Sequence, residues 1–335
     1  MRQTVSAGSA GGNALISGKD VIFAIAMRKC ILALAGMLLL LVSCRSEVDT
    51  SGRIVTDAAE EVTETSAVLY GYADLPEDGA GVKFGIVYSK DKNPTADNGR
   101  AVTSAAREAD GRFSCKATGM WMMTTYYYRA FIKENGRYRY GKTLSLTTKD
   151  FPAAAQEAVD LGLSVKWGSC NLGAATPYET GDYFAWGETT PKTDYSFNTY
   201  KWAQAEKFTK YNLTDGKLAL DRSDDAVQVS MGGGWRMPTY HEFRELLGCP
   251  RVKTGRGDVE GFLITGPSGK SIFLPAGGVR VGTSLDLEGG RGCYWTSVLQ
   301  SPNSYYSWTG FMQSNLMVMS ALSRTHGHSI RPVME

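Results

Sequence analysis

The sequence lacks an excess of charge of either sign. It has 36 Lys and Arg against 34 Asp and Glu, for a formal net charge of +2. Residues 44–335 alone hold 32 basic and 33 acidic residues. Nucleic-acid binding needs a basic surface that displaces the counterions of the phosphates. We therefore expect no nucleic-acid partner.

Histidine is also scarce, with three residues in 335. His326 and His328 would face the same side of an expected strand, where they could hold a metal with a third ligand such as His241. Nothing in the sequence places His241 near the other two, so we interpret all three as ordinary surface histidines.

No calcium-loop spacing, nucleophile–base arrangement, Gly-rich phosphate loop or carboxylate pair is present either. Four acids between residues 215 and 225 offer oxygen ligands that calcium could use, although they fit helix capping and solvation better: Asp215, Asp221, Asp224 and Asp225. We expect no enzymatic activity and no cofactor, with a structural calcium ion unsupported by any motif.

Long apolar runs are absent except between residues 30 and 42, which is shorter than the roughly 20 residues that span a bilayer. Arg28 and Lys29 precede this run and small residues follow it, as in a cleaved export signal. We expect Met27 to be the start, residues 1–26 to be an over-extended N-terminus, and residues 1–43 to be absent from the mature protein.

The sequence LVSC at residues 41–44 resembles the lipobox of bacterial lipoproteins. The resemblance implies cleavage before Cys44 and acylation of this residue, for example with palmitate. Several acyl chains give stable membrane anchoring. No Asp follows Cys44 directly, and by resemblance to lipoprotein sorting this implies the outer membrane, with the acidic Glu47 and Asp49 favouring cell-surface exposure.

Residues 58–149, after a linker at 44–57, show short alternating runs and no helical periodicity, which predicts an all-β domain. Asn135-Gly136 between two such runs predicts a hairpin. The motifs GM at 119–120, TTYYYRA at 124–130 and LSLTT at 144–148 resemble a fibronectin type III sandwich. The resemblance implies that Tyr126 forms the tyrosine corner. The apolar loop 121–123 departs from the family pattern, and it either contacts the next domain or is buried within its own domain.

A linker at 150–156 leads to a second domain at 157–335. Thr239 and Glu242 predict a capping box for a helix that ends at Gly248, and a second helix is expected to start near residues 223–226. Strands are expected at residues 163–167, 261–265, 271–274, 293–298, 306–312 and 328–333.

Five ordered motifs cover this second domain: VDLGLSVKW at 159–167, CNLGA at 170–174, GDYFAWGE at 181–188, GGWRMPT at 233–239 and SIRPV at 329–333. Together they resemble the Fibrobacter-type major paralogous domain. That family is similar to C-type-lectin-like and formylglycine-generating-enzyme-like folds, so the resemblance implies an α+β frame with long loops and paired terminal strands. Four tryptophans lie in or near these motifs and are expected in the core: Trp167, Trp186, Trp235 and Trp295.

Formylglycine-generating enzymes use a cysteine pair near the C-terminus, and the matching stretch here, ALSRTHGH at 321–328, has none. A degenerate relative of those enzymes is therefore the weaker alternative. Cys170 and Cys249 would close a long loop if they paired, and burial as thiols is the other interpretation.

The leading hypothesis is a non-enzymatic surface lipoprotein, held to the membrane by its lipid anchor, that binds a glycan or protein. The alternative is a structural or assembly subunit of a surface complex or appendage. The expected fold requires few of the residues in segment 300–326. The Tyr, Trp, Ser and Asn content of this segment is typical of binding loops. The expected ligand-binding residues come from this segment and from an earlier long loop: Asn303, Tyr305, Trp308, Asn315, Arg324, His326, Tyr195, Phe197 and Tyr200.

Overall fold

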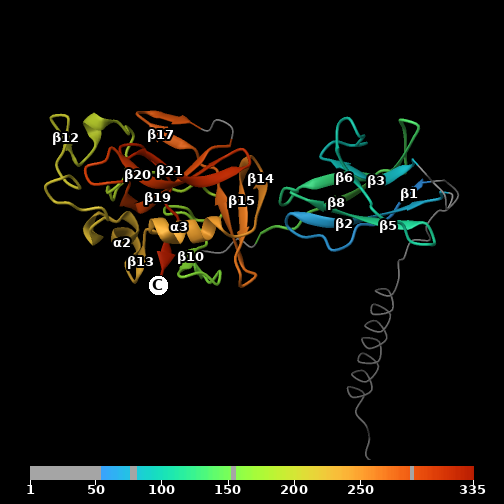
Figure 1. Cartoon of the computed structure of the whole chain (residues 1–335), viewed down its shortest axis with the longest axis horizontal. Coiled ribbons are helices and arrows are strands. Elements are labelled where there is room, and N and C mark those ends of the chain that lie inside the picture. The colour runs from blue at the N-terminus through green and yellow to red at the C-terminus, as the bar shows by residue number, and fades with distance from the viewer. Residues whose placement is uncertain (1–53, 76–80, 152–155, 287–289) are drawn as a thin grey trace, which may run out of the picture. The chain divides into compact units, whose positions relative to one another are not determined.

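The computed structural model divides the chain into two compact units, residues 1–49 and 50–335. It describes residues 54–75, 81–151, 156–286 and 290–335, all in the second unit (Figure 1). The expected signal segment and Cys44 lie outside the described residues. Within the described ranges, no helix is long and apolar enough to cross a membrane.

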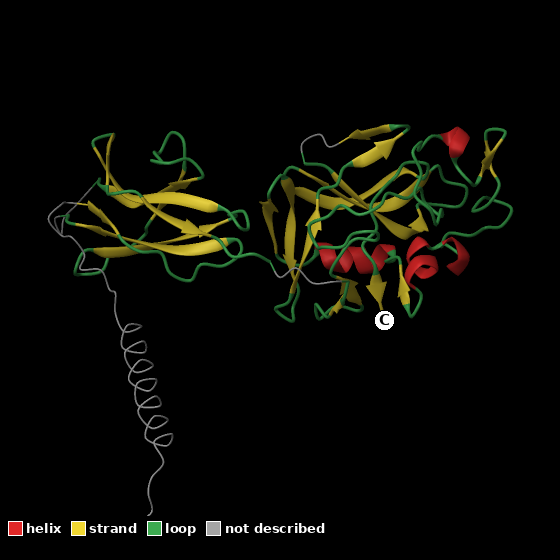
Figure 2. Ribbon diagram, turned by 180° about the vertical axis from the view of Figure 1, so that it is seen from behind, coloured by secondary structure: helices red, strands yellow, loops and turns green. Residues whose placement is uncertain are grey.

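Residues 54–147 fold into two antiparallel sheets, ordered β1-β2-β5 and β4-β3-β6-β7, with β8 also paired to β6 (Figures 1 and 2). The strands are β1 (Ile54–Thr56), β2 (Ser66–Ala73), β3 (Lys83–Ser89), β4 (Arg100–Thr103), β5 (Arg112–Thr118), β6 (Thr125–Glu134), β7 (Arg137–Tyr140) and β8 (Leu144–Thr147). The expected hairpin joins β6 and β7, and Asn135 and Gly136 both have positive φ, 52° and 79°.

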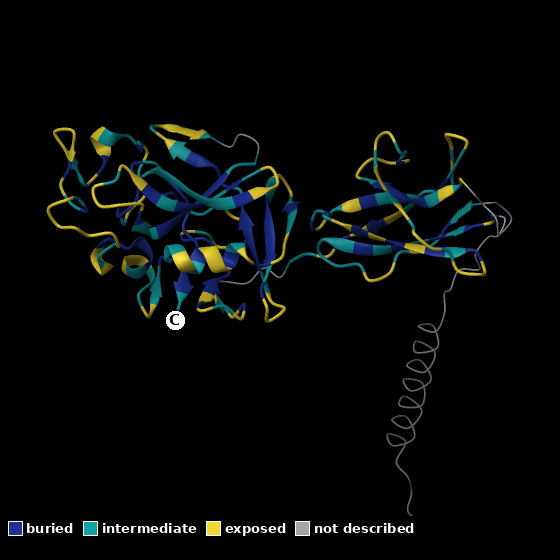
Figure 3. Cartoon of the chain, viewed as in Figure 1, coloured by how far each residue is buried: buried dark blue, intermediate teal, exposed yellow. Residues whose placement is uncertain are grey.

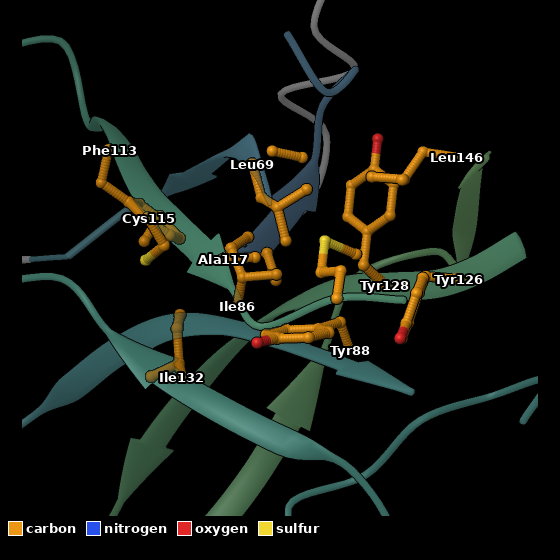
Figure 4. Close-up of a cluster of buried hydrophobic side chains, with 14 of the residues drawn as sticks. Leu69, Ile86, Tyr88, Phe113, Cys115, Ala117, Tyr126, Tyr128, Ile132 and Leu146 are labelled. Atoms are coloured by element: carbon orange, nitrogen blue, oxygen red, sulfur yellow. The ribbon is translucent and has the colours of Figure 1, made fainter. Parts of the chain in front are cut away.

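Side chains from both sheets fill one core, so this part is a β-sandwich. Leu69 and Ala117 come from one sheet and Ile86, Tyr128 and Ile132 from the other, and all are at most 1 % exposed (Figure 4). Each strand contributes alternate residues to this core because successive side chains point to opposite faces.

The predicted tyrosine corner is present. The hydroxyl of Tyr126 accepts a hydrogen bond of 2.9 Å from the backbone N–H of Trp121, five residues upstream. The strand order, the shared core and this corner together make residues 54–147 a fibronectin type III-like β-sandwich.

The apolar loop 121–123 contacts the following part of the chain, which is the first of the two expected alternatives. Met122 is fully buried with Tyr178, Leu263 and Phe273 of the following part of the chain, and its N–H donates to Gly255 O at 2.8 Å. Met123, in contrast, is 56 % exposed. The loop therefore contacts residues beyond 156 through Met122.

Residues 158–334 form several small sheets around two α-helices (Figures 1 and 2). The first strands are β9 (Ala158–Val159), β10 (Lys166–Gly168), β11 (Ala203–Gln204), β12 (Lys207–Phe208), β13 (Trp235–Arg236), β14 (Arg251–Arg256), β15 (Val259–Thr265) and β16 (Ser271–Pro275). The later strands are β17 (Val279–Val281), β18 (Ser284–Asp286), β19 (Gly292–Leu299), β20 (Tyr306–Gln313), β21 (Leu316–Ser323) and β22 (Val333–Met334). The helices are η1 (Phe197–Thr199), η2 (Arg222–Asp224), α2 (Ala226–Met231) and α3 (Tyr240–Leu247).

Both helix predictions are confirmed. Thr239 caps α3 and forms the complete capping box with Glu242, and Gly248 ends the helix. The second helix, α2, begins at Ala226, at the end of the expected range, because Asp225 is its N-cap and accepts from Val227 N and Gln228 N. Residues just before it form the short η2 instead.

Two strand predictions were wrong in their bounds. The strand expected at 163–167 begins only at Lys166, the first residue of β10. The residues before it follow a turn in which Asp160 Oδ1 accepts from Gly162 N. Residues 328–332 do not form one ladder, since His328 and Ser329 pair with different segments through single bridges. The regular strand there is the short β22.

The core of this part is rich in tryptophan, as expected. Trp167, Trp186 and Trp295 are completely buried, whereas Trp235 is only partly buried and packs against its cluster. Cys249 is a buried thiol without a disulfide, so the alternative of buried thiols holds for it.

Candidate functional site

One pocket lies at the expected binding segment 300–326, and its other lining residues come from 206–214, outside the residues expected from the earlier long loop. It has a volume of about 300 Å³ and is lined from the β11–β12 region and from the loop before β20. We call it the aromatic pocket, and its lining residues are Glu206, Lys207, Phe208, Asn212, Leu213, Thr214, Asn303 and Tyr305.

Two rings, Phe208 and Tyr305, line the aromatic pocket, and the ring of Phe197 packs against both. Phe208 meets Tyr305 edge to face, with ring centroids 4.8 Å apart. Phe197 stacks against Tyr305 at 6.1 Å and also packs on Phe208 at 5.6 Å. The loop around η1 and the loop before β20, about 100 residues apart in sequence, therefore share one ring cluster.

The exposed groups of this cluster face outward. Tyr305 is 50 % exposed although two rings support it, and Leu213 is 74 % exposed. Asn303 is also exposed. The turn between β11 and β12, which contributes Glu206, is drawn exposed in Figure 3. A ligand would find an aromatic face, an aliphatic side chain and several polar groups at one place.

Contrary to the prediction, Arg324 is not a surface residue. Its buried side chain contacts Phe208 and the loop that lines the aromatic pocket. It is completely buried and its guanidinium lies 3.9 Å from the ring centre of Phe208. Its Nη2 donates to Lys210 O at 2.9 Å, its Nη1 to Tyr211 O at 3.1 Å, and its Nε to the Tyr200 hydroxyl at 3.0 Å. Arg324 thus fixes the loop that carries the pocket.

A second set of polar groups fixes the same loop from the other side. The Lys210 ammonium donates to Asp224 at 2.5 Å and to Asp221 at 2.7 Å, and the Tyr211 hydroxyl donates to Asp224 at 2.6 Å. The hydrogen bond from Lys210, with that from Lys217, lowers the pKa of Asp221. Burial and the neighbouring Asp224 raise the pKa of Tyr211, which keeps this phenol protonated as a donor.

The backbone around the aromatic pocket is strained. Four of the non-glycine residues with positive φ lie in its two segments: Ala205 (46°), Glu206 (59°), Tyr211 (57°) and Asn303 (60°). Such conformations cost energy and are retained where the surrounding structure imposes them, often at functional sites. Asp215 holds Tyr211 in place by accepting its backbone N–H at 2.6 Å.

Several predicted site residues lie elsewhere or inside. Tyr195 and Tyr200 are buried. The hydroxyl of Tyr195 donates to Tyr183 O, and that of Tyr200 donates to Trp186 O. Trp308 is half-buried against Tyr240, with ring centroids 4.7 Å apart. Asn315 is exposed in the turn between β20 and β21, outside the pocket lining.

The histidines do not meet in a metal site. His326 is half-buried, and burial lowers its pKa. His328 is completely buried, with its ring 3.6 Å from that of Trp295 and its Nδ1 3.2 Å from Thr309 Oγ1, and burial lowers its pKa well below the usual value. His241 is exposed on α3. Among the residues that the structure describes, no group of three His, Cys, Asp or Glu is placed to hold a metal.

The four acids once considered for calcium have other partners. Asp225 caps α2 and also accepts from Met237 N at 2.9 Å, and Asp215 accepts from the N–H groups of its own turn. Asp221 and Asp224 are bound to lysines, as described above. Their positions fit helix capping and ion pairing.

Sequence reasoning missed most of the pocket floor: Glu206, Lys207, Phe208, Asn212, Leu213 and Thr214. The turn-forming residues Asn212, Asp215 and Gly216 were a signal for a structured loop, since Asn212 Oδ1 accepts from Thr214 N in such a turn. Phe208 gave no signal, because a lone Phe between polar residues reads equally well as core.

A larger pocket of about 770 Å³ lies between the turn at residues 162–164 and the end of α3. Its carboxylate, Glu245, already accepts hydrogen bonds from the N–H and hydroxyl of Ser164. Its remaining lining is mostly apolar or glycine. The aromatic pocket offers more varied exposed groups.

No protein-family model and no curated protein matches the chain. Solved structures with some likeness include the sensor domain of the anti-sigma factor RsgI4 of Pseudobacteroides cellulosolvens, at 19 % identity, with 29 % of this chain and 94 % of that chain covered and a TM-score of 0.24. Another is a fibronectin type III domain of the human KIAA0970 protein, at 11 % identity, with 30 % and 77 % covered and a TM-score of 0.22. A redesigned β-sandwich protein, at 17 % identity, has 28 % and 92 % covered and a TM-score of 0.21. At these scores, the assignment of the sandwich in this chain depends on its own strand order and core.

Proposed function

We propose that this chain is a non-enzymatic lipoprotein of the outer membrane, exposed at the cell surface, that binds a glycan or protein ligand through the aromatic pocket. The observation that carries the proposal is the meeting of Tyr305, Phe208 and Phe197 at a strained, firmly held pair of loops. Rigid aromatic groups give contact area at low entropic cost, and neighbouring Asn and Thr side chains supply hydrogen bonds. Aromatic faces also stack on the C–H surfaces of sugars.

A C-type-lectin-like fold for residues 157–335 belongs to the same proposal. Two features support it besides the sequence motifs. The strands from the two ends of this part share one sheet: β9 pairs with β10, and β10 pairs with β22, where Trp167 lies opposite Val333 and Lys166 opposite Met334. Long irregular loops then carry the exposed groups, as in a frame whose loops can change without loss of the core.

A non-catalytic role is favoured by the state of the C-terminal stretch at 321–328. Arg324, Thr325 and His328 are buried there, and Arg324 uses its donors on backbone carbonyls and a tyrosine. This stretch contains no cysteine, the residue that formylglycine-generating enzymes use near their C-terminus.

The experiment is a glycan array, followed by a cell-binding assay, with the full chain and two single variants. Tyr305→Ala removes the exposed ring of the pocket and is expected to lower binding at least tenfold. Tyr306→Ala is the matched control, because Tyr306 is equally exposed, at 49 %, but does not line the pocket. Equal binding by both variants and the parent chain would refute the pocket as the ligand site.

The anchor is tested separately by metabolic labelling with palmitate. Cys44→Ala is expected to abolish the label and release the protein from membranes, because the acyl chains are its only attachment in this proposal. Membrane retention with unchanged labelling would contradict it. Because this test does not depend on the ligand, the anchor and the pocket can fail independently.

A further inference from the structure

The polar side chains of the aromatic pocket differ in whether they already have a hydrogen-bond partner. The Asn212 amide is used within its own loop, where it donates to Phe208 O and accepts from Thr214 N. Five other lining side chains are exposed and have no hydrogen bond or ion pair with any residue that the structure describes: Glu206, Lys207, Thr214, Asn303 and Tyr305. They comprise a carboxylate, an ammonium, an amide and two hydroxyls, so they offer donors and acceptors together and their charges cancel.

The pocket has room for one small ring. Its volume of about 300 Å³ lies at the lower end of the range of roughly 300–1,000 Å³ for ligand sites. Of its two lining rings, Tyr305 is 50 % exposed whereas Phe208 is 7 % exposed. One exposed ring is a platform for the C–H face of one sugar. The interior of a polysaccharide would need a row of such platforms for its successive sugars.

A peptide fits the same surroundings less well. An extended peptide binds by adding a strand to a sheet edge, and a helical peptide binds along an apolar groove. The strands beside the pocket, β11 and β12, have two residues each, which is too short for a hydrogen-bonded ladder with a peptide. The open side chains are mostly polar, and the hydroxyls of a sugar, which both donate and accept, match them better.

The turn that carries Glu206 is strained, and this points to a role for its carboxylate. Ala205 and Glu206 join β11 to β12 as a two-residue hairpin turn, and both have positive φ. Such turns favour Asn-Gly, the pair that this chain has between β6 and β7. Alanine and glutamate are less stable in this conformation, and strain of this kind concentrates at ligand sites. The turn thus gives up stability and presents a carboxylate at the aromatic pocket.

We propose that the aromatic pocket binds one neutral hexose at the end of a glycan, with the apolar face of the sugar on Tyr305 and its hydroxyls donating to the Glu206 carboxylate. This inference rests on the proposed function and narrows the ligand from a glycan or protein to one class of sugar. Hydrogen bonds to an ionised carboxylate are stronger than those between neutral groups, so Glu206 contributes most to the choice of sugar. The carboxylate of an acidic sugar would meet Glu206 as a like charge, which disfavours it.

Calorimetric titration of the full chain in detergent tests the class of sugar. The probes are the methyl pyranosides of glucose, galactose and mannose, with glucuronic acid and N-acetylneuraminic acid as acidic counterparts. We expect at least one methyl hexoside to bind with a Kd of about 1 mM, since a ligand of this size makes few contacts and loses its freedom on binding. The acidic sugars are expected to bind at least ten times more weakly.

Two variants and a matched control assign the contacts. Glu206→Gln is expected to lower the affinity for the hexoside about tenfold, because charge-assisted hydrogen bonds become neutral ones. Tyr305→Ala is expected to abolish measurable binding. Glu61→Gln is the control and should bind as the parent chain does, since Glu61 is also exposed with a positive φ, 47°, but does not line the pocket.

The strained turn gives a second readout. The double variant Ala205→Asn with Glu206→Gly introduces the pair that the turn favours, so its urea midpoint is expected to rise. Its affinity for the hexoside is expected to fall at least as far as that of Glu206→Gln. A turn with a structural role alone would gain stability and keep the sugar.

The proposal is overturned if no methyl hexoside binds at tens of millimolar, or if Glu206→Gln and Glu61→Gln bind the hexoside equally well. An acidic sugar or a protein that binds the full chain and is lost in Tyr305→Ala would also overturn it, while the proposed function would stand. A ligand whose binding Tyr305→Ala does not change would refute both. Circular dichroism of each variant checks that the fold is kept.

Discussion

Replacing Arg324 with methionine is expected to destabilise residues 157–335 and to loosen the aromatic pocket. The variant keeps a similar volume but leaves the carbonyls of Lys210 and Tyr211 without their donor inside the protein. Each buried acceptor left without a partner costs about 1–3 kcal/mol. Arg324 has no carboxylate among its hydrogen-bond partners, so removing its buried charge offsets part of that cost. We therefore expect a net loss of about 2–4 kcal/mol in the free energy of unfolding.

Urea denaturation followed by tryptophan fluorescence measures this loss, and hydrogen exchange shows where it acts. Amides of residues 200–214 should lose protection, while those of β20 should keep it. Arg139→Met is the control, since this arginine forms an exposed pair with Glu134 in the sandwich and should change stability by less than about 1 kcal/mol. An unchanged midpoint for Arg324→Met, or protection lost evenly over the whole part, would refute the role given to Arg324.

Three further predictions follow from burial and charge. Trp295→Ala should cost about 3–5 kcal/mol, because the ring is fully buried and leaves a cavity; a loss below about 1 kcal/mol in urea denaturation would contradict this. Burial alone would raise the pKa of Glu242, but its hydrogen bonds with Arg236 and the capping backbone outweigh burial and lower its pKa from the ordinary value of 4.5. Ionised Glu242 therefore stabilises the fold above that value, and this contribution is lost as the pH falls. In Glu242→Gln, the free energy of unfolding should no longer depend on pH through this group. Burial raises the pKa of Cys115 to about 11 and of Cys293 to about 12, so both thiols should resist maleimide at pH 8 until urea unfolds the sandwich and the later part respectively; rapid labelling without urea would show exposed thiols.

The sequence predicted the features that depend on nearby residues. The hairpin at Asn135 and Gly136 and the capping box at Thr239 follow from short motifs with a local physical cause, whereas the tyrosine corner at Tyr126 was implied by the resemblance to fibronectin type III domains. The buried tryptophans were also correct for three of four, because large aromatic residues within a frame have few places to lie except the core.

What could not be predicted depends on long-range packing. Arg324 reads as a surface residue in sequence, since charged side chains are rarely buried. Its burial requires carbonyls of residues 210 and 211, which only the fold brings near. The same applies to Phe208, which joins Tyr305 across about 100 residues. In β2, small residues such as Ala67 and Gly71 face the core while Tyr70 and Tyr72 do not, so size alone misassigns the buried face.

The pairing of β10 with β22 has a consequence for the order of events during biosynthesis. Trp167 has one strand partner nearby in the sequence, Val159, but its second partner is Val333. The later part of the chain therefore cannot complete this sheet while residue 333 is still on the ribosome. Closing a loop of that length is entropically costly and slows folding. The sandwich contains only contacts within residues 54–147 in its sheets and can fold earlier. A chain that stalls before residue 333 would therefore carry a folded sandwich followed by an incompletely folded second part. The exposed core of this second part is the feature that quality-control proteases recognise.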